Sequence, residues 1–322
     1  MGRYLKVVLQ VLIVVCMVDG MIDGTLSVYA KAQSILRNLL YAAGGDVALP
    51  SPRQHFTGGV GMIVSPQNRP HMTVGPEGRR GPPPSSETPI NRRILLLGAS
   101  QAFGLRIGDD QTLAAIMQQD KPGWEILNYA APGETLPVHW LHADHLTADG
   151  VSFDSVLVVN GLIDITKLCF PPPTQLGPHN AFRRLYDMIA EKLSPPSLSP
   201  TACATEAVAH RVARQVYDDM LRLLAVADAR HVPMTIAFPP VLYDHPASLR
   251  SHAGAPQFEA LAASHMPAIR ALRRMIAEGD ERRIVDMSRA LDSVDRAYID
   301  VYSHFSNEGS RVVARHLEAV LP

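Results

Sequence analysis

The sequence predicts an α/β fold with a mostly parallel sheet that carries helices on both faces. Strand-like and helix-like patterns alternate from residue 92 to the C-terminus, and such alternation favours right-handed crossovers between parallel strands. The segments 94–97 and 156–159 are continuous apolar runs, which is typical of strands buried on both faces. Residues 98–104 follow the first run and are rich in small side chains. This turn is therefore expected at the carboxyl edge of the sheet, where open parallel sheets bind their ligands.

Each expected element follows from its local pattern. Short aliphatic runs bounded by turn residues predict strands, and longer stretches with apolar positions three and four residues apart predict helices. The chain of 322 residues is 47% hydrophobic, enough for one sizeable core, which we assign to residues 92–322. In order, the elements are a strand at 92–98, a helix at 111–119, a strand at 125–130, a helix at 138–147, a strand at 155–160, helices at 181–193 and 205–230, a strand at 233–238, a helix at 256–278, a short strand at 283–286 and a terminal helix from Ser310 to Leu321.

Residues 1–24 have the charge pattern of an export signal. The apolar stretch Val7–Val18 follows two cations, Arg3 and Lys6, and precedes two anions, Asp19 and Asp23. This asymmetry predicts an uncleaved signal anchor or a cleaved signal peptide, with the remaining chain outside the cytoplasm. The stretch is shorter than the roughly 17 residues that a full span needs. An inner-membrane anchor with the remaining chain in the periplasm is the preferred interpretation, and a secreted form and a buried amino-terminal helix stay open.

Two further segments precede the main domain. Residues 25–45 place apolar side chains three and four residues apart, which predicts an amphipathic helix. Residues 46–91 contain many Pro and Gly residues and predict a spacer.

The overall charge excludes one class of partner. Lys and Arg together number 30, Asp and Glu number 31, and the formal net charge is −1. This balance gives no electrostatic basis for nucleic-acid binding. No His or Cys cluster has metal-ligand spacing either. We therefore expect neither a nucleic-acid partner nor a metal site.

Two short motifs carry candidate chemistry. Residues 92–104 read RRILLLGASQAFG, so Ser100 follows a buried-type strand in a turn of small residues. Residues 300–309 read DVYSHFSNEG, which places His304 in the loop before the last helix. A serine hydroxyl is a weak nucleophile unless a base lies beside it. The two motifs together predict acyl transfer, with Ser100 as nucleophile and His304 as base.

Two more motifs lie between them, and the four together resemble those of the SGNH hydrolases, the GDSL-like esterases and lipases. Residues 126–135 read ILNYAAPGET and residues 155–164 read SVLVVNGLID. The resemblance covers residues 92–322 and implies a flavodoxin-like three-layer α/β/α sandwich, an ester hydrolase activity and no cofactor. Residues 71–81 also resemble a short strand that precedes the catalytic domain in some membrane-tethered members, with a plain linker as the alternative.

The resemblance implies roles for six residues and leaves a seventh, Asp286, as a fallback. Ser100 and His304 would be nucleophile and base, and Asp300 would orient the imidazole, with Asp286 as a fallback. The backbone N–H of Gly133 would stabilise the oxyanion together with that of Ser100. Asn160 and Asp164 are the further candidates for oxyanion or substrate binding.

Two positions depart from the family pattern. Members usually carry Gly-x-Asn-Asp in the third motif, and the Asn donates to the oxyanion, whereas this chain has Ile163 there. Losing one such donor typically costs on the order of 10² to 10³ in turnover. Asn160 and Asn128 are candidates to replace it. The usual Asp-x-x-His is lengthened by one residue between Asp300 and His304, which a local bulge would accommodate.

The cysteines fit an exported chain. Three are present, and Cys16 lies in the amino-terminal apolar run. Cys169 and Cys203 flank a proline-rich segment and would form a disulfide in an oxidising compartment, with two unpaired buried thiols as the alternative.

The sequence thus predicts an extracytoplasmic serine esterase that removes acyl groups, O-acetyl among them, from a surface carbohydrate or a related small ester. One alternative is a catalytically weakened domain that binds a surface glycan or an assembly partner. Another is an acyltransferase that uses the same serine.

Overall fold

The computed structural model of the chain describes residues 54–57, 61–69, 71–81, 89–169, 202–251 and 255–321. The chain divides into two compact units, Met1–Val47 with Pro172–Ser199 and Ala48–Pro171 with Pro200–Pro322. All described residues belong to the second unit. The expected export signal at 1–24 and the expected helices at 25–45 and 181–193 lie outside the described residues. Within the described ranges, no helix has both the length and the apolar character needed to cross a bilayer.

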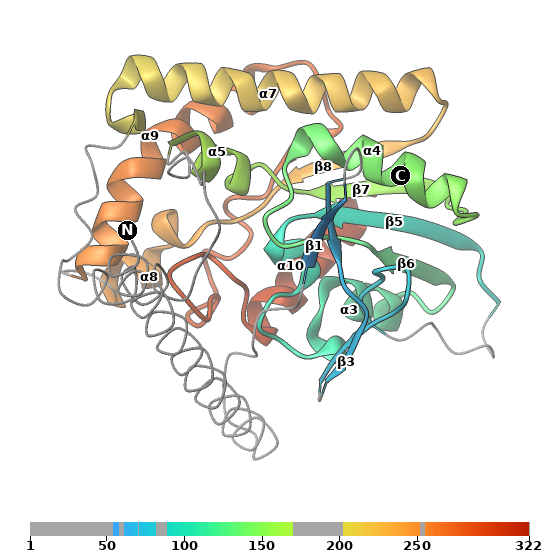
Figure 1. The fold of residues 1–322 in the computed structure, drawn as a ribbon. Coiled ribbons are helices and arrows are strands. Elements are labelled where there is room, and N and C mark those ends of the chain that lie inside the picture. The colour runs from blue at the N-terminus through green and yellow to red at the C-terminus, as the bar shows by residue number, and fades with distance from the viewer. Residues whose placement is uncertain are drawn as a thin grey trace, which may run out of the picture. The chain divides into compact units, whose positions relative to one another are not determined.

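A five-stranded parallel sheet forms the centre of the domain (Figure 1). Its strands are β5 (Arg92–Gly98), β6 (Trp124–Asn128), β7 (Ser155–Val159), β8 (Met234–Phe238) and β9 (Ile284–Asp286). They lie in the order β6-β5-β7-β8-β9, and every neighbouring pair is parallel. This is the flavodoxin-like order, in which the chain reverses its direction of winding between β6 and β7. The prediction of a parallel α/β sheet is confirmed.

Helices cover both faces of the sheet. They are α2 (Ser100–Phe103), α3 (Leu113–Asp120), α4 (Leu136–Ala148), α5 (Leu162–Cys169), α7 (Glu206–Ala229), α8 (Pro246–Ser251), α9 (Pro256–Glu278) and α10 (Asn307–Val320). Leu95 and Leu97 of β5 pack in a buried cluster with α4, α5, α7 and α9, whereas Ile94 and Leu96 pack in a second cluster with α2, α3 and α10. Alternate side chains of one strand point to opposite faces, so an all-apolar strand supplies both cores.

Side-chain caps fix where several helices begin. The Thr205 hydroxyl accepts a hydrogen bond from Val208 N at the start of α7. Ser306 does the same for Gly309 N at the start of α10, at 3.0 Å. Each cap satisfies a backbone donor that has no partner within its own helix. The cap at Ser306 also fixes the direction in which the His304 loop enters α10.

Part of the segment expected as a spacer forms structure against the domain. Two antiparallel hairpins, β1 (Gln54–Thr57) with β2 (Gly61–Val64) and β3 (Gln67–Arg69) with β4 (Met72–Val74), lie within residues 46–91. The Arg80 guanidinium is fully buried, where it pairs with Asp109 at 2.7 Å. For residues 61–81 the spacer interpretation is therefore corrected, and the plain-linker alternative for residues 71–81 fails.

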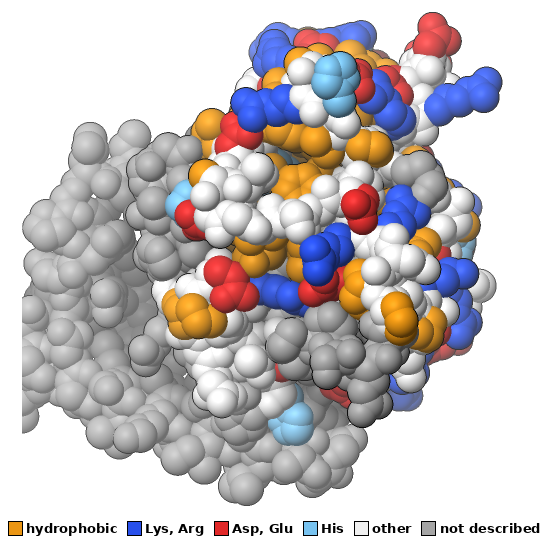
Figure 2. Space-filling model, turned by 90° about the vertical axis from the view of Figure 1, so that its right-hand side faces the viewer, with side chains coloured by type: hydrophobic (Ala, Val, Ile, Leu, Met, Phe, Trp, Pro, Cys, Tyr) orange, Lys and Arg blue, Asp and Glu red, His pale blue; other side chains and the backbone are white. Residues whose placement is uncertain are grey.

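The surface drawn in Figure 2 mixes charges of both signs. Lys and Arg side chains alternate there with Asp and Glu side chains, and apolar groups lie between them. No extended patch of one charge covers the described residues of this face.

Candidate active site

Ser100 lies at the carboxyl edge of the sheet, where β5 turns sharply into α2. Gly98 has φ of +147°, and a Cβ there would lie 2.3 Å from the carbonyl oxygen of Val159. Only glycine fits so close to the neighbouring strand. The turn makes Ser100 the first residue of α2, where its backbone N–H has no partner within the helix.

His304 lies in the loop that leads into α10, and Asp300 holds its ring. The Nδ1 atom of His304 is 2.6 Å from Asp300 Oδ2. The other carboxylate oxygen accepts hydrogen bonds from Tyr302 N at 2.9 Å and from His304 N at 3.4 Å. Nδ1 therefore carries the proton in this pair, which leaves Nε2 as the basic nitrogen.

A left-handed residue absorbs the extra position between Asp300 and His304. Ser303 has φ of +67°, an uncommon conformation for a residue other than glycine. Its buried hydroxyl accepts a hydrogen bond from Leu242 N at 2.9 Å. Its carbonyl accepts one from Gln101 Nε2 at 2.9 Å. The loop thus bulges at Ser303 and keeps the contact between Asp300 and His304.

The surroundings keep Asp300 ionised. Burial alone would raise the pKa of this carboxyl, but the hydrogen bond and charge of His304, the Tyr302 N–H and the charge of Arg106 together hold the pKa below its ordinary value. Arg106 Nε is 3.4 Å from Asp300 Oδ2, and Arg106 itself has φ of +72°. An ionised Asp300 stabilises a protonated imidazole on His304.

One cavity of about 380 Å³ brings the main candidates together. Ser100, Gly133 and His304 all line it, and Ile163 lies in its wall. The structure thus assembles, around one space, a hydroxyl, an imidazole with its carboxylate and the glycine turn expected to supply an oxyanion donor.

Gly133 is held in a left-handed turn. Its φ is +84°, and a Cβ on it would meet no atom within 4 Å, so backbone conformation rather than space requires glycine here. Its carbonyl accepts a hydrogen bond from Lys167 Nζ at 2.5 Å. Glu134 N donates to Ala131 O at 3.0 Å. These two bonds hold the turn in place.

Neither asparagine proposed as a replacement donor lines the cavity. The side-chain nitrogen of Asn160 lies 2.9 Å from Glu134 O and 2.7 Å from His139 Nε2. That of Asn128 donates to Ala102 O at 3.2 Å. The structure thus places the amide of Asn160 against the loop behind Gly133 and does not bring it to the cavity that Ser100 lines.

Asp164 also supports this loop instead of facing the cavity. Its Oδ1 accepts a hydrogen bond from Leu136 N, at the start of α4, at 2.9 Å. Burial raises the pKa of Asp164 to about 6, and the bond from Leu136 lowers it only in part. Asp164 is not among the residues that line the cavity, and the bond to Leu136 N is that of a carboxylate that caps the start of a helix. The fallback Asp286 pairs with Arg273 at 3.2 Å.

Behind Gly133 lies a buried ionisable cluster that sequence reasoning missed. The Glu134 carboxylate is 3.4 Å from His139 Nδ1 and 3.2 Å from His142 Nδ1. Burial would raise the pKa of Glu134, but the hydrogen bonds and charges of the two histidines bring it below its ordinary value. Among the described residues, no group of three or more His, Cys, Asp or Glu side chains is arranged to hold a metal ion. The sequence signal that could have revealed this cluster is the spacing of His139 and His142, which lie three residues apart in α4.

Several residues that line the cavity were also missed. Gln101 is next to the serine, and its Nε2 joins two loops by donating to Pro240 O at 3.1 Å as well as to Ser303 O. Tyr302 lies within the histidine motif. Tyr243 and His265 come from distant segments, and nothing in the sequence pointed to them.

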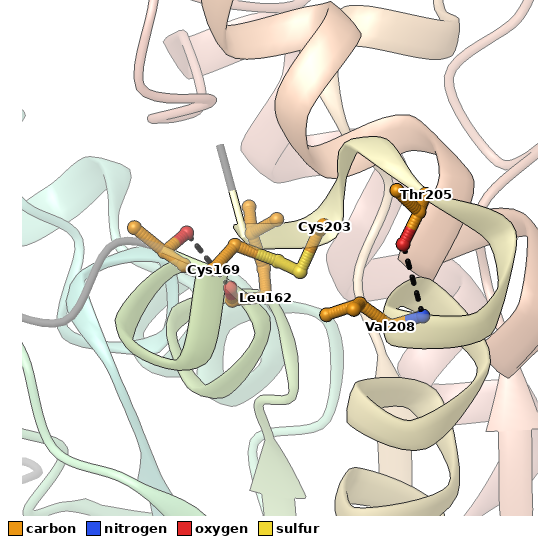
Figure 3. The surroundings of a disulfide bond; sticks show 6 residues. Leu162, Cys169, Cys203, Thr205 and Val208 are labelled. Atoms are coloured by element: carbon orange, nitrogen blue, oxygen red, sulfur yellow. Dashed lines mark hydrogen bonds between the residues drawn. A yellow bond between two sulfur atoms is a disulfide. The ribbon is translucent and has the colours of Figure 1, made fainter. Parts of the chain in front are cut away.

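Cys169 and Cys203 form a disulfide, with their Cα atoms 5.2 Å apart. The bond joins the end of α5 to the short helix η2 (Ala202–Ala204), which leads into α7 (Figure 3). Because α5 also supplies Ile163 and Lys167, the bond braces the cavity wall and the support of the Gly133 turn.

Comparisons with known proteins gave matches only among solved structures. No protein-family model matches the chain, and no curated protein does. A member of the lipolytic G-D-S-L family from Veillonella parvula is similar, with 12% identity, 71% of this chain and 97% of that chain covered, and a TM-score of 0.45. The acetyl xylan esterase AlAXEase has 12% identity, 71% and 100% coverage and a TM-score of 0.44. An acetyl xylan esterase from Geobacillus stearothermophilus has 14% identity, 72% and 95% coverage and a TM-score of 0.38.

Proposed function

We propose that this protein is a serine ester hydrolase in which Ser100 is the nucleophile, His304 the general base and Asp300 the residue that orients the base. The observation that carries the proposal is the 2.6 Å contact between His304 and Asp300, in a ring that lines the same cavity as Ser100 and Gly133. A hydroxyl, an oriented imidazole and backbone donors around one space are the components of acyl transfer.

The reaction follows from these positions. The Ser100 oxygen attacks the ester carbonyl while its proton passes to Nε2 of His304. The Ser100 and Gly133 N–H groups stabilise the negative carbonyl oxygen. The intermediate then expels the alcohol, which takes the proton from Nε2. Water attacks the acyl-Ser100 ester by the same route, and the carboxylic acid leaves.

We further propose that the enzyme acts outside the cytoplasm, tethered by its amino-terminal segment, on acyl groups of a surface carbohydrate. The charges around the apolar stretch at 7–18 favour export. The disulfide suits an oxidising compartment. Tyr302 is 51% exposed beside His304, with the ring centroids 6.5 Å apart, which gives a sugar ring an aromatic surface on the alcohol side of the ester.

Two alternatives use the same site. Ile163 in the cavity wall, where the family resemblance implies a donor, favours a weakened domain that binds a glycan without turnover. The same serine would serve an acyltransferase if a sugar hydroxyl replaced water in the second step.

Labelling of the serine tests the proposal. A fluorophosphonate probe should modify the wild-type chain at Ser100, and Ser100→Ala should lose both the label and roughly 10³-fold or more of the ester hydrolysis. Ser293→Ala, which changes an exposed serine that does not line the cavity, controls for labelling of other hydroxyls. Product analysis with a sugar present separates hydrolysis from transfer, and an unlabelled, inactive but folded wild-type protein would leave only the binding alternative.

A further inference from the structure

The cavity has a buried end and an exposed rim. We define the buried end as the part lined by Leu162 and Thr166 from α5, Leu261 and His265 from α9, and Tyr243 from the short helix η3 (Leu242–Asp244); Thr166 and Leu261 are half-buried there, and the other three side chains are buried. Tyr243 and His265 are 5% and 1% exposed, whereas Tyr302 at the rim is 51% exposed. In an ester hydrolase the alcohol must leave while the acyl group stays bound to the serine. The buried end therefore suits the acyl group, and the rim suits the alcohol.

The cavity as a whole is larger than an acetyl group requires. From Ser100 to the rim and the buried end it measures about 380 Å³, the space of on the order of ten water-sized groups of about 30 Å³ each. An acetyl group has three heavy atoms and would leave most of this space empty. The van der Waals contacts that the wall side chains could make with a longer acyl chain would then be missing.

The walls are apolar and uncharged. Among the described residues that line the cavity there is no Lys, Arg, Asp or Glu. Thr166 donates its hydroxyl to Leu162 O at 2.9 Å, and Tyr243 donates its own to Val301 O at 2.9 Å. Burial lowers the pKa of His265 to about 4, so this ring is neutral near pH 7. A charged acyl group would lose its hydration here without gaining a partner.

The walls are also held in place. The disulfide at Cys169 ties the end of α5 to the segment before α7. The His265 ring stacks on Tyr243, with centroids 5.6 Å apart. A space kept open by braced helices is preformed for its ligand.

Resting on the proposed ester hydrolysis, we propose that the preferred acyl group is an uncharged apolar chain of about six carbons, bound between α5 and α9, with Leu261 limiting its length. Each methylene that becomes buried contributes about a fourfold gain in binding at most. From acetyl to hexanoyl, kcat/KM should therefore rise by 10- to 100-fold.

The test measures kcat/KM of the purified full-length protein on 4-nitrophenyl acetate, butyrate, hexanoate and octanoate. Leu261→Trp should fill the buried end and lower hexanoate hydrolysis at least tenfold, with acetate changed less than threefold. Leu261→Ala should move the preference toward octanoate, which keeps the test valid if the Trp variant does not fold. Leu221→Trp is the matched control, because Leu221 is on α7, is 36% exposed and does not line the cavity.

The outcomes separate the two proposals. If acetate is the best substrate and neither Leu261 variant changes the preference, the acyl-length proposal is overturned, while hydrolysis that depends on Ser100 keeps the proposed function. If no ester is hydrolysed and the fluorophosphonate does not label Ser100, both are overturned.

Discussion

The two sides of the candidate site differ in how completely they are equipped. On the base side, Asp300 receives the His304 ring and two backbone N–H groups, and a bulge at Ser303 preserves this arrangement despite an extra residue. On the oxyanion side, the Gly133 turn is well supported, but Ile163 contributes only an apolar surface to the cavity. The base side thus has both groups that proton transfer needs, an imidazole and its orienting carboxylate. On the other side, only the backbone N–H groups of Ser100 and Gly133 are candidates to stabilise the oxyanion. The comparison predicts an enzyme whose rate is limited on the oxyanion side.

The largest effect should come from the base side. Asp300→Asn keeps the size of the side chain but removes the charge that stabilises protonated His304, so kcat should fall by on the order of 10⁴. Steady-state kinetics on 4-nitrophenyl hexanoate measure this. Asp286→Asn is the control, since that carboxylate pairs with Arg273, and equal losses in both variants would contradict the assignment of Asp300.

A gain is expected on the oxyanion side. Ile163→Asn places a side-chain donor where the family resemblance implies one, and should raise kcat by up to about 10²-fold. Ile163→Leu controls for the change in shape. A folded Asn variant with an unchanged kcat would show that the missing donor does not limit the rate.

The disulfide should stabilise the domain that carries the oxyanion side. Cys169 and Cys203 are separated by 34 residues, and closing a loop of this length stabilises a fold by about 2 to 4 kcal/mol. The double change to Ala should lower the free energy of unfolding by that amount in urea titrations. A reductant should lower the stability of the wild-type protein but not that of the double variant, and equal sensitivity of both would refute the assignment.

A smaller, pH-dependent effect should arise at Asp164. Burial raises its pKa from 3.8 to about 6, so the folded state binds this proton more tightly than the unfolded state, and stability falls as the pH rises through that window. Asp164→Asn removes the effect and keeps an acceptor for Leu136 N. The stability of the variant relative to wild type should be greater at pH 7 than at pH 4 by about 2 kcal/mol. Chemical denaturation at both pH values measures this difference, and a pH-independent difference would contradict the raised pKa.

The features that the sequence predicted correctly are those set by residues close together in the chain. The apolar run of β5 and the small-residue turn after it lie within a few residues of Ser100, so the strand, its burial and the position of the serine could be predicted together. The contact between Asp300 and His304 was also local. The hairpins at 54–64 and 67–74 were not predicted, apart from the short strand that the resemblance implied within 71–81, because many Pro and Gly residues interrupt the pattern there. The buried Arg80 pairs with the distant Asp109, a contact that local spacing does not reveal.

Asn160, His265 and Tyr243 have positions that depend on tertiary packing, so the local sequence did not predict them. Asn160 follows β7 as the resemblance expects, but its amide lies against Glu134 O and His139. The direction of this amide depends on α4, the helix that carries His139. His265 and Tyr243 reach the cavity from segments with no motif. Such contacts arise from tertiary packing and are not encoded in local spacing.

Trapping the acyl-enzyme tests the central claim most directly. The full-length protein is mixed with 4-nitrophenyl hexanoate, quenched with acid within milliseconds to seconds and digested for mass spectrometry. The account predicts a hexanoyl group on Ser100, formed in step with the release of nitrophenol and absent from Ser100→Ala. Turnover that leaves Ser100 unmodified at every time point, or an acyl group on another side chain, would contradict it.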